Sequence, residues 1–126
     1  MDAVVRPREV AWFRAAIAAG APCVMVDHAF YRSLGRRRAS LEPATYRLLR
    51  STGFRGVAIT DSLSIVAHPP RDWPVVAAPA GAELLLFTDP SEARAAIDEL
   101  LPLARGGELD AHVARVLRFR ARYEAR

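Results

Sequence analysis

Apolar residues occur along the chain in two patterns, short unbroken runs and longer stretches with helical spacing. The unbroken runs cover residues 23–26, 57–59 and 83–87, and polar residues follow each of them. Runs of this length are typical of parallel strands that are covered on both faces. We therefore expect three buried strands. The acidic residues that follow them are Asp27, Asp61 and Asp89.

Helical spacing of the apolar residues predicts helices between these strands. One helix covers residues 8–19, and a second runs from Pro43 to Gly53. Residues 64–74 are expected to form a loop, because proline lacks the backbone N–H that regular structure uses. The short apolar segment after this loop is expected to be interrupted by Pro79.

The last third of the chain has the most regular pattern. After Pro90, apolar residues between positions 93 and 104 recur at the spacing of one helix face, and the pattern ends at Gly106. A final helix is expected from its N-cap, Asp110, to about Tyr123. The apolar residues that this helix should bury are Val113, Val116, Leu117 and Phe119.

Strands that alternate with helices form βα units, and such units give a parallel sheet with right-handed crossovers. Two architectures fit this order, a small open sheet and a part of a (β/α)8 barrel. A complete barrel needs about 250 residues, whereas this chain has 126. The pattern therefore predicts an α/β fold in a single domain over residues 1–126 and does not choose between the two architectures.

Composition narrows the classes of protein to consider. The chain is 52% hydrophobic and 25% charged, and it has neither a signal-peptide pattern nor an apolar stretch near the about 20 residues that a membrane helix needs. A cytoplasmic protein without a membrane partner is expected. The single cysteine, Cys23, is expected to be a buried thiol, and the three histidines lack metal-ligand spacing, so no metal or other cofactor is expected.

All 18 basic residues are arginine, which together with abundant alanine is typical of a GC-rich genome. The net charge of +4 is therefore weak evidence for a nucleic-acid partner, and none is expected. The densest basic cluster is Arg36, Arg37 and Arg38. We expect a solvated loop there, and the alternative is a patch that binds phosphate or RNA.

The segment "GFRGVAITDSLSI", residues 53–65, distinguishes Asp61 from the other acids. Together with "FRAAIAAGAPCVMVDHAFY" before it and "AGAELLLFTDPSEARAAIDELLPLARGGELDAHVARVLRFR" after it, this segment resembles the C-terminal part of the catalytic barrel of glycoside hydrolase family three. The branch that it resembles most is the bacterial β-N-acetylglucosaminidases (β-N-acetylhexosaminidases), which act on peptidoglycan fragments during cell-wall recycling. The residues that match the nucleophile motif of this branch are Gly53, Phe54, Gly56, Val57, Thr60, Asp61 and Leu63.

The resemblance implies a partial TIM-type barrel of about three parallel βα units followed by C-terminal helices. It also implies retaining hydrolysis of O-glycosyl bonds, with Asp61 as the nucleophile that forms a covalent glycosyl-enzyme intermediate. His28 lies where the family commonly has a residue that lines the sugar pocket, and the alternative is a histidine that bonds to its local loop. The other histidines, His68 and His112, are expected to be structural or solvated.

The sequence departs from the family at the acid/base. That group is a histidine in a mobile loop introduced by a Lys-His-Phe-Pro-Gly-His-Gly signature, which precedes the matched region in the family and does not occur in this sequence. We therefore expect a truncated or split glycosidase that binds an N-acetylglucosaminide only in a completed barrel. The alternative is a non-catalytic interaction module, which pairs with itself or with an upstream barrel half through apolar strand faces and an unpaired edge.

Overall fold

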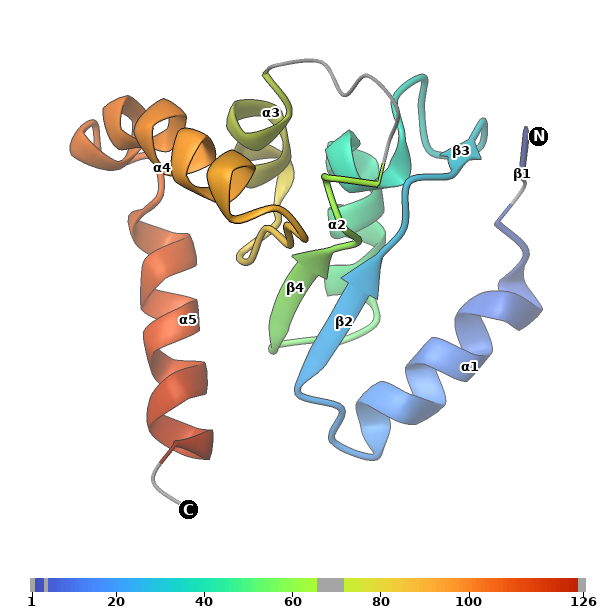
Figure 1. The fold of residues 1–126 in the computed structure, drawn as a ribbon. Coiled ribbons are helices and arrows are strands. Elements are labelled where there is room, and N and C mark those ends of the chain that lie inside the picture. Colours follow the sequence, from blue (N-terminus) through green and yellow to red (C-terminus); the bar gives the residue numbers. More distant parts are fainter. Residues whose placement is uncertain (1, 4, 66–71, 125–126) are drawn as a thin grey trace.

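The computed structural model describes residues 2–3, 5–65 and 72–124, which form a helix-rich chain around a small parallel sheet (Figure 1). Its helices are α1 (Pro7–Ala18), α2 (Pro43–Ser51), α3 (Trp73–Ala80), α4 (Pro90–Arg105) and α5 (Asp110–Tyr123), with a 3-10 helix at Ala39–Leu41. Its strands are β1 (Asp2–Ala3), β2 (Cys23–Val26), β3 (Phe30–Tyr31) and β4 (Val57–Thr60). Within the described part of the chain, no helix is long and apolar enough to cross a membrane.

The central sheet consists of β2 and β4, which are parallel as the sequence predicts. Cys23 lies opposite Val57, and Val26 lies opposite Thr60. The helix α2 connects the two strands, so together they form a βα unit and the strand that follows it. The short strands β1 and β3 form a second parallel pair.

The predicted third strand, residues 83–87, is an extended segment that joins β4 through a single parallel bridge between Leu84 and Ile59. The bridge is not continued because the next donor, Leu86 N–H, bonds to the side-chain oxygen of Thr60 at 3.2 Å. A side chain therefore takes the place of a backbone acceptor, and a regular strand does not form. The prediction of three full strands is corrected to two strands and one bridged segment.

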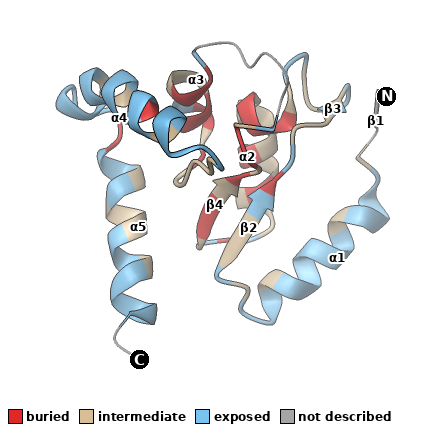
Figure 2. Ribbon diagram, in the orientation of Figure 1, coloured by how far each residue is buried: buried red, intermediate tan, exposed pale blue. Residues whose placement is uncertain are grey.

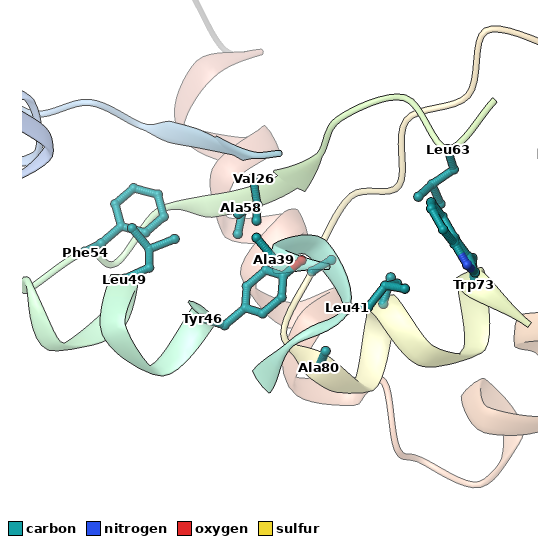
Figure 3. Packing of buried hydrophobic residues seen from close by; sticks show 12 residues of the cluster. Val26, Ala39, Leu41, Tyr46, Leu49, Phe54, Ala58, Leu63, Trp73 and Ala80 are labelled. Atoms are coloured by element: carbon teal, nitrogen blue, oxygen red, sulfur yellow. The ribbon is translucent and has the colours of Figure 1, made fainter. Parts of the chain in front are cut away.

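The hydrophobic core lies between one face of the β2–β4 sheet and the helices α2 and α3 (Figure 3). The sheet contributes Val26 and Ala58, α2 contributes Tyr46 and Leu49, and α3 contributes Trp73. Burial of such apolar side chains is the main favourable term in folding. The helices that follow β2 and β4 are therefore fixed to the sheet.

The opposite face of the sheet is open at Met25 of β2, which corrects the prediction that both faces are covered throughout. Val57 of β4, on the same face, is fully buried. Met25 points to this face because side chains alternate along a strand, and 52% of its surface is exposed. The helix α1 does not cover the sheet, since none of its residues is buried. Figure 2 shows that buried residues gather on β4, α2 and α3, whereas α1 and α5 are largely exposed.

Prolines do not prevent helix formation in α3, so the predicted interruption is wrong. Pro74 lies in the first turn, where the backbone N–H has no partner within the helix. Pro79 lies in the last turn, where its missing N–H removes at most one hydrogen bond. The predicted loop also includes residues 66–71, and these lie outside the described residues together with His68.

The two C-terminal helices lie where the sequence predicts them but leave apolar side chains exposed. Leu109 rather than Asp110 is the N-cap of α5, and no residue of α5 is buried. Val113 and Leu117 are each more than half exposed, at 51% and 56%. The predicted burial of this face is therefore wrong within this chain, and the apolar face remains available for contact.

Candidate functional site

The carboxyl ends of β2 and β4 lie side by side and carry the two predicted site residues. The backbone N–H of Asp61 donates to the carbonyl oxygen of Val26 at 2.8 Å. Nε2 of His28 lies 3.1 Å from the carbonyl oxygen of Ser62, the residue after Asp61. The parallel register therefore brings His28 and Asp61 to one edge of the sheet.

The residues of the motif before Asp61 shape the approach to β4. Gly53 follows α2 with φ of +90°, a left-handed conformation that glycine adopts readily. Phe54 is anchored in the core with 1% of its surface exposed. A side chain at Gly56 would collide with the carbonyl oxygen of Pro22 and with the Phe54 ring. Glycine at position 56 thus allows β4 to start directly beside the turn that precedes β2.

Thr60, the residue before Asp61, is bonded to the segment 83–87, on the side of β4 away from β2. It is fully buried, and its backbone N–H donates to the carbonyl oxygen of Leu84 at 3.1 Å. Its hydroxyl accepts from Leu86 N–H. The strand end that carries Asp61 is therefore bonded both to β2 and to the segment 83–87, and this limits movement of the Asp61 backbone.

Asp61 differs from the other two acids that follow apolar runs. Asp27 uses both carboxylate oxygens within its own turn, accepting from Ala29 N–H at 3.0 Å and from the Tyr31 hydroxyl at 2.7 Å. Asp89 caps α4 and accepts from Ser91 N–H at 2.7 Å. The bonds from Ser91 lower the pKa of Asp89.

The half-buried carboxylate of Asp61 has one bond, which its Oδ1 accepts from Ser62 N–H at 2.7 Å. Within residues 2–3, 5–65 and 72–124, its second oxygen has no hydrogen-bond partner. Among the described residues, Asp61 is therefore a strand-end acid with one carboxylate oxygen that accepts no hydrogen bond from the protein.

Both ring nitrogens of His28 have protein partners. The carbonyl oxygen of Ser62 can only accept, so Nε2 carries a hydrogen, and in the neutral ring Nδ1 accepts from the Ser40 hydroxyl at 2.7 Å. The ring also packs on Trp73, with centroids 5.3 Å apart. The structural alternative for His28 is thus present in the structure, and a contact with sugar stays a prediction.

The arginine cluster separates into two parts. Arg36 and Arg37 are exposed, as the solvated-loop interpretation predicts. Arg38 is instead structural, because it donates to the carbonyl oxygen of His28 at 2.9 Å and lies 4.8 Å above the Phe30 ring. This arginine therefore holds the loop that carries His28.

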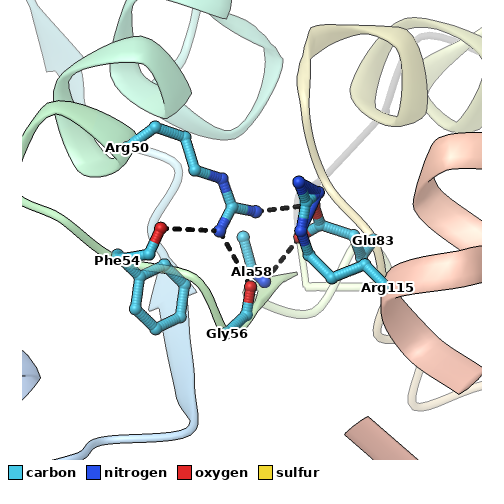
Figure 4. Close-up of polar contacts among 6 residues, drawn as sticks. All are labelled: Arg50, Phe54, Gly56, Ala58, Glu83 and Arg115. Carbon is cyan, nitrogen blue, oxygen red and sulfur yellow. Dashed lines mark hydrogen bonds and ion pairs between the residues drawn. The ribbon is translucent and has the colours of Figure 1, made fainter. Parts of the chain in front are cut away.

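A buried ion network that the sequence analysis did not identify lies beside the start of β4 (Figure 4). The Glu83 side chain is 1% exposed, and its Oε1 accepts from Arg50 at 2.6 Å and from Arg115 at 2.9 Å. Its Oε2 accepts from the backbone N–H of Ala58 at 2.7 Å. Glu83 therefore ties α2, α5 and β4 together, and a charge at the start of an apolar run was its only signal in the sequence.

The remaining candidate residues do not form a metal site. Cys23 is a half-buried free thiol. Burial raises its pKa, and the charge of Glu83 raises it further. Nδ1 of His112 is buried without a hydrogen-bond partner. In the described segments, no three His, Cys, Asp or Glu side chains are grouped so that they could hold a metal ion.

Comparison with known proteins identifies the family and the fold. A family model described as the glycosyl hydrolase family 3 N-terminal domain matches residues 2–119. A family 3 glycosyl hydrolase from Mycobacterium smegmatis is 32% identical, with a TM-score of 0.74 over 85% of this chain. A β-N-acetylhexosaminidase from Beutenbergia cavernae is 30% identical, with a TM-score of 0.80 over 92% of this chain. LpqI of M. tuberculosis is 30% identical, with a TM-score of 0.72 over 85% of this chain.

The chain spans only a part of each of these relatives. It covers 37% of the M. smegmatis protein, 39% of the B. cavernae protein and 35% of LpqI. No curated protein sequence matches the chain at a significant level. The small parallel sheet and its helices thus correspond to part of a TIM-barrel-like domain, which favours the barrel over the open sheet.

Proposed function

Because the chain belongs to glycosyl hydrolase family 3, we propose that it forms the C-terminal part of a retaining β-N-acetylglucosaminidase barrel in which Asp61 is the catalytic nucleophile. The proposed substrate is an N-acetylglucosaminide derived from peptidoglycan. The sequence motif and the likeness to the B. cavernae β-N-acetylhexosaminidase support this substrate class. The proposed hydrolysis requires a completed barrel, and these 126 residues alone have little or no activity.

The proposed chemistry has two steps. An oxygen of Asp61 attacks the anomeric carbon of the sugar, the bond from that carbon to the leaving oxygen breaks, and a general acid gives the leaving oxygen a proton. Water then attacks the anomeric carbon and releases Asp61, while the same group, now a base, takes the proton from the water. The chain contributes the nucleophile and its support to both steps.

The observation that carries this proposal is the free oxygen of Asp61 on a fixed strand end. A nucleophile must face the substrate without a competing donor and must keep its position as charge develops. The bond from Asp61 N–H to Val26 fixes the backbone, and Ser62 N–H holds only Oδ1. Asp27 lacks this combination because both of its carboxylate oxygens accept bonds within its own turn, and Asp89 lacks it because its carboxylate caps α4 and does not follow a paired strand.

We propose that His28 lines the sugar pocket as a fixed wall. Its partners Ser40 and Ser62 hold both ring nitrogens, so the ring keeps its orientation beside Asp61. The same bonds argue against His28 as the general acid, because the one hydrogen of the neutral ring is already donated from Nε2 to the carbonyl oxygen of Ser62. The acid therefore has to come from outside the described site.

Release of nitrophenol from 4-nitrophenyl N-acetyl-β-D-glucosaminide tests the proposal on the chain itself. We expect the purified chain to give no more nitrophenol than buffer does. Turnover that is present in the chain and lost in Asp61→Asn would show that these 126 residues contain their own acid. Turnover that is unaffected by Asp61→Asn would contradict the role of Asp61.

A second candidate function is pairing with another barrel segment or with a second copy of the chain. It is favoured by the open face at Met25 and by the free edge of β2, which pairs only with β4 among the described residues. An unpaired parallel edge beside exposed apolar side chains is a strong drive to associate. Light scattering at micromolar concentration tests it, and a monodisperse monomer that binds no hydrophobic dye would contradict it.

A further inference from the structure

A cavity lies at the end of the sheet opposite to Asp61. It has a volume of about 430 Å³, within the range of about 300–1,000 Å³ that is typical of ligand sites. Its walls come from the turn before β2, from the turn before β4 and from the later turns of α5. The amino-terminal ends of both strands and the end of α5 lie at the same end of the molecule (Figure 1).

Four arginines line this cavity: Arg55, Arg115, Arg118 and Arg122. The last three are spaced by three and four residues along α5, so they lie on one face of that helix. Like charges at this spacing destabilise a helix. A bound anion would remove that repulsion.

The acidic residues nearby do not neutralise this cluster. Glu83 is shared between Arg50 and Arg115, which leaves one positive charge in that network. Glu124 is bonded to Arg120, which does not line the cavity.

Among the described residues, two arginines of the cavity also lack acidic partners, and the charge of the cluster affects the neighbouring Arg50. Neither Arg55 nor Arg118 has an acidic partner within the described residues. Burial lowers the pKa of Arg50, the charge of Glu83 opposes this by raising the pKa, and the charges of Arg115 and Arg55 lower it. The cavity is therefore positively charged, and the guanidinium groups of Arg55 and Arg118 can donate hydrogen bonds to a ligand.

One wall of the cavity is aromatic. The rings of Phe119 and Tyr123 lie 5.1 Å apart, tilted by 43°, and both line the cavity together with Ile17 from α1. An inorganic anion alone would leave this wall unused. A ligand with an anionic part and a flat or apolar part fits both walls.

We propose that this cavity binds a small organic phosphate. The phosphate oxygens accept hydrogen bonds from Arg55, Arg118 and Arg122, because the planar guanidinium presents paired donors that match a phosphate. The organic part packs against Phe119 and Tyr123. The site is separate from the edge that carries Asp61, so it does not depend on the proposed hydrolysis.

Isothermal titration of the 126-residue chain with ADP tests this site. We expect ADP to bind more tightly than inorganic pyrophosphate, because pyrophosphate lacks the part that contacts the aromatic wall. The variant Arg118→Gln/Arg122→Gln should weaken ADP binding about tenfold or more, since each lost charged hydrogen bond costs about 1.5–3 kcal/mol, and 1.4 kcal/mol is a tenfold change. Equal binding of ADP and pyrophosphate would overturn the organic part of the proposal.

A matched control separates a site from general charge attraction. The variant Arg36→Gln/Arg37→Gln removes the same two charges from an exposed loop outside the cavity, and we expect less than a twofold change. A second variant, Arg55→Gln, changes the opposite wall without touching α5 and should also weaken binding. Equal loss in both double variants, or no binding of ADP to the unaltered chain, would overturn the proposal. Binding of polyglutamate but not of ADP would assign the surface to an acidic protein partner and would also overturn it.

Discussion

The backbone N–H of Asp61 lies 2.8 Å from the carbonyl oxygen of Val26, so the first residue after β4 is bonded to the last residue of β2. This bond holds the backbone of Asp61 and does not involve its carboxylate. Of that carboxylate, Oδ1 is engaged by the neighbouring Ser62 N–H. The structure therefore separates what positions Asp61 from what its side chain can do.

The first prediction concerns Asp61→Asn, which should change the free energy of unfolding by less than about 0.5 kcal/mol. The asparagine amide oxygen can still accept from Ser62 N–H, and the backbone bond to Val26 is unchanged. By comparison, Asp89→Ala should lower the stability measurably, because it removes the N-cap of α4. Urea denaturation measures both. If Asp61→Asn is the more damaging change, Asp61 is a structural residue.

The second prediction concerns the network around Glu83. Glu83→Gln should cost about 2–4 kcal/mol, because it removes the charge that compensates two partly buried guanidinium groups. Its matched control is Glu124→Gln, in which the partner Arg120 and the glutamate are 58% and 60% exposed. That exposed pair should contribute much less than the buried network, because solvent screens it. Equal effects of the two substitutions in urea denaturation would contradict a structural role for the network.

The third prediction concerns the glycine at the start of β4. Gly56→Ala should destabilise the chain by about 1–3 kcal/mol, since the new methyl group meets the Pro22 carbonyl oxygen and the Phe54 ring. Gly106→Ala is the control, because Gly106 has φ of −76° and its added methyl group would make ordinary contacts. Thermal unfolding monitored by circular dichroism compares them. A neutral Gly56→Ala would show that the close approach at this strand start is absent.

The fourth prediction concerns alkaline pH and the buried Tyr46. Burial, and after it the charge of Glu83, raises the pKa of Tyr46, whose hydroxyl donates to the Ser40 carbonyl oxygen at 2.8 Å. The folded state thus favours the neutral phenol, and this contribution is complete below the unfolded pKa of about 10 and is lost as pH rises through the folded value. Between pH 8 and 11 the unaltered chain should lose about 1 kcal/mol more stability than Tyr46→Phe loses.

The control for this experiment is Tyr123→Phe, which changes a more exposed tyrosine at the end of α5. It should keep the alkaline loss of the unaltered chain. Urea denaturation at the two pH values gives the comparison. An equal alkaline loss in Tyr46→Phe and in the unaltered chain would contradict the assignment to Tyr46.

Local signals in the sequence predicted most helices and the paired strands. Glycine after α2 and proline at the start of α4 act on the backbone of their own neighbourhood, and the positions of these helices are confirmed. The unbroken runs at residues 23–26 and 57–59 identify β2 and β4 for the same reason. The end of the third run could not be predicted, because the bond from Leu86 N–H to the Thr60 side chain joins residues far apart in the sequence.

The exposure of the apolar helix faces and the pairing of the buried charges could not be predicted from the sequence. An apolar face on α5 shows that something should cover it but not which segment does so, and Leu117 remains exposed. The pairing of Glu83 with Arg50 and Arg115 needs three elements to meet and has no local pattern. Likewise, only the tertiary structure separates Asp61, with its free oxygen, from the turn-closing Asp27.

The most direct test of Asp61 as nucleophile is a chimera with the B. cavernae β-N-acetylhexosaminidase. This chain replaces the structurally matched part of that enzyme, so that the remainder supplies the rest of the barrel and its acid. We expect the chimera to release nitrophenol from 4-nitrophenyl N-acetyl-β-D-glucosaminide, and Asp61→Asn to lower kcat about a thousandfold or more, whereas Asp27→Asn should lower it less than about tenfold. An Asp61→Asn chimera that keeps more than about a tenth of the unaltered rate would contradict the account.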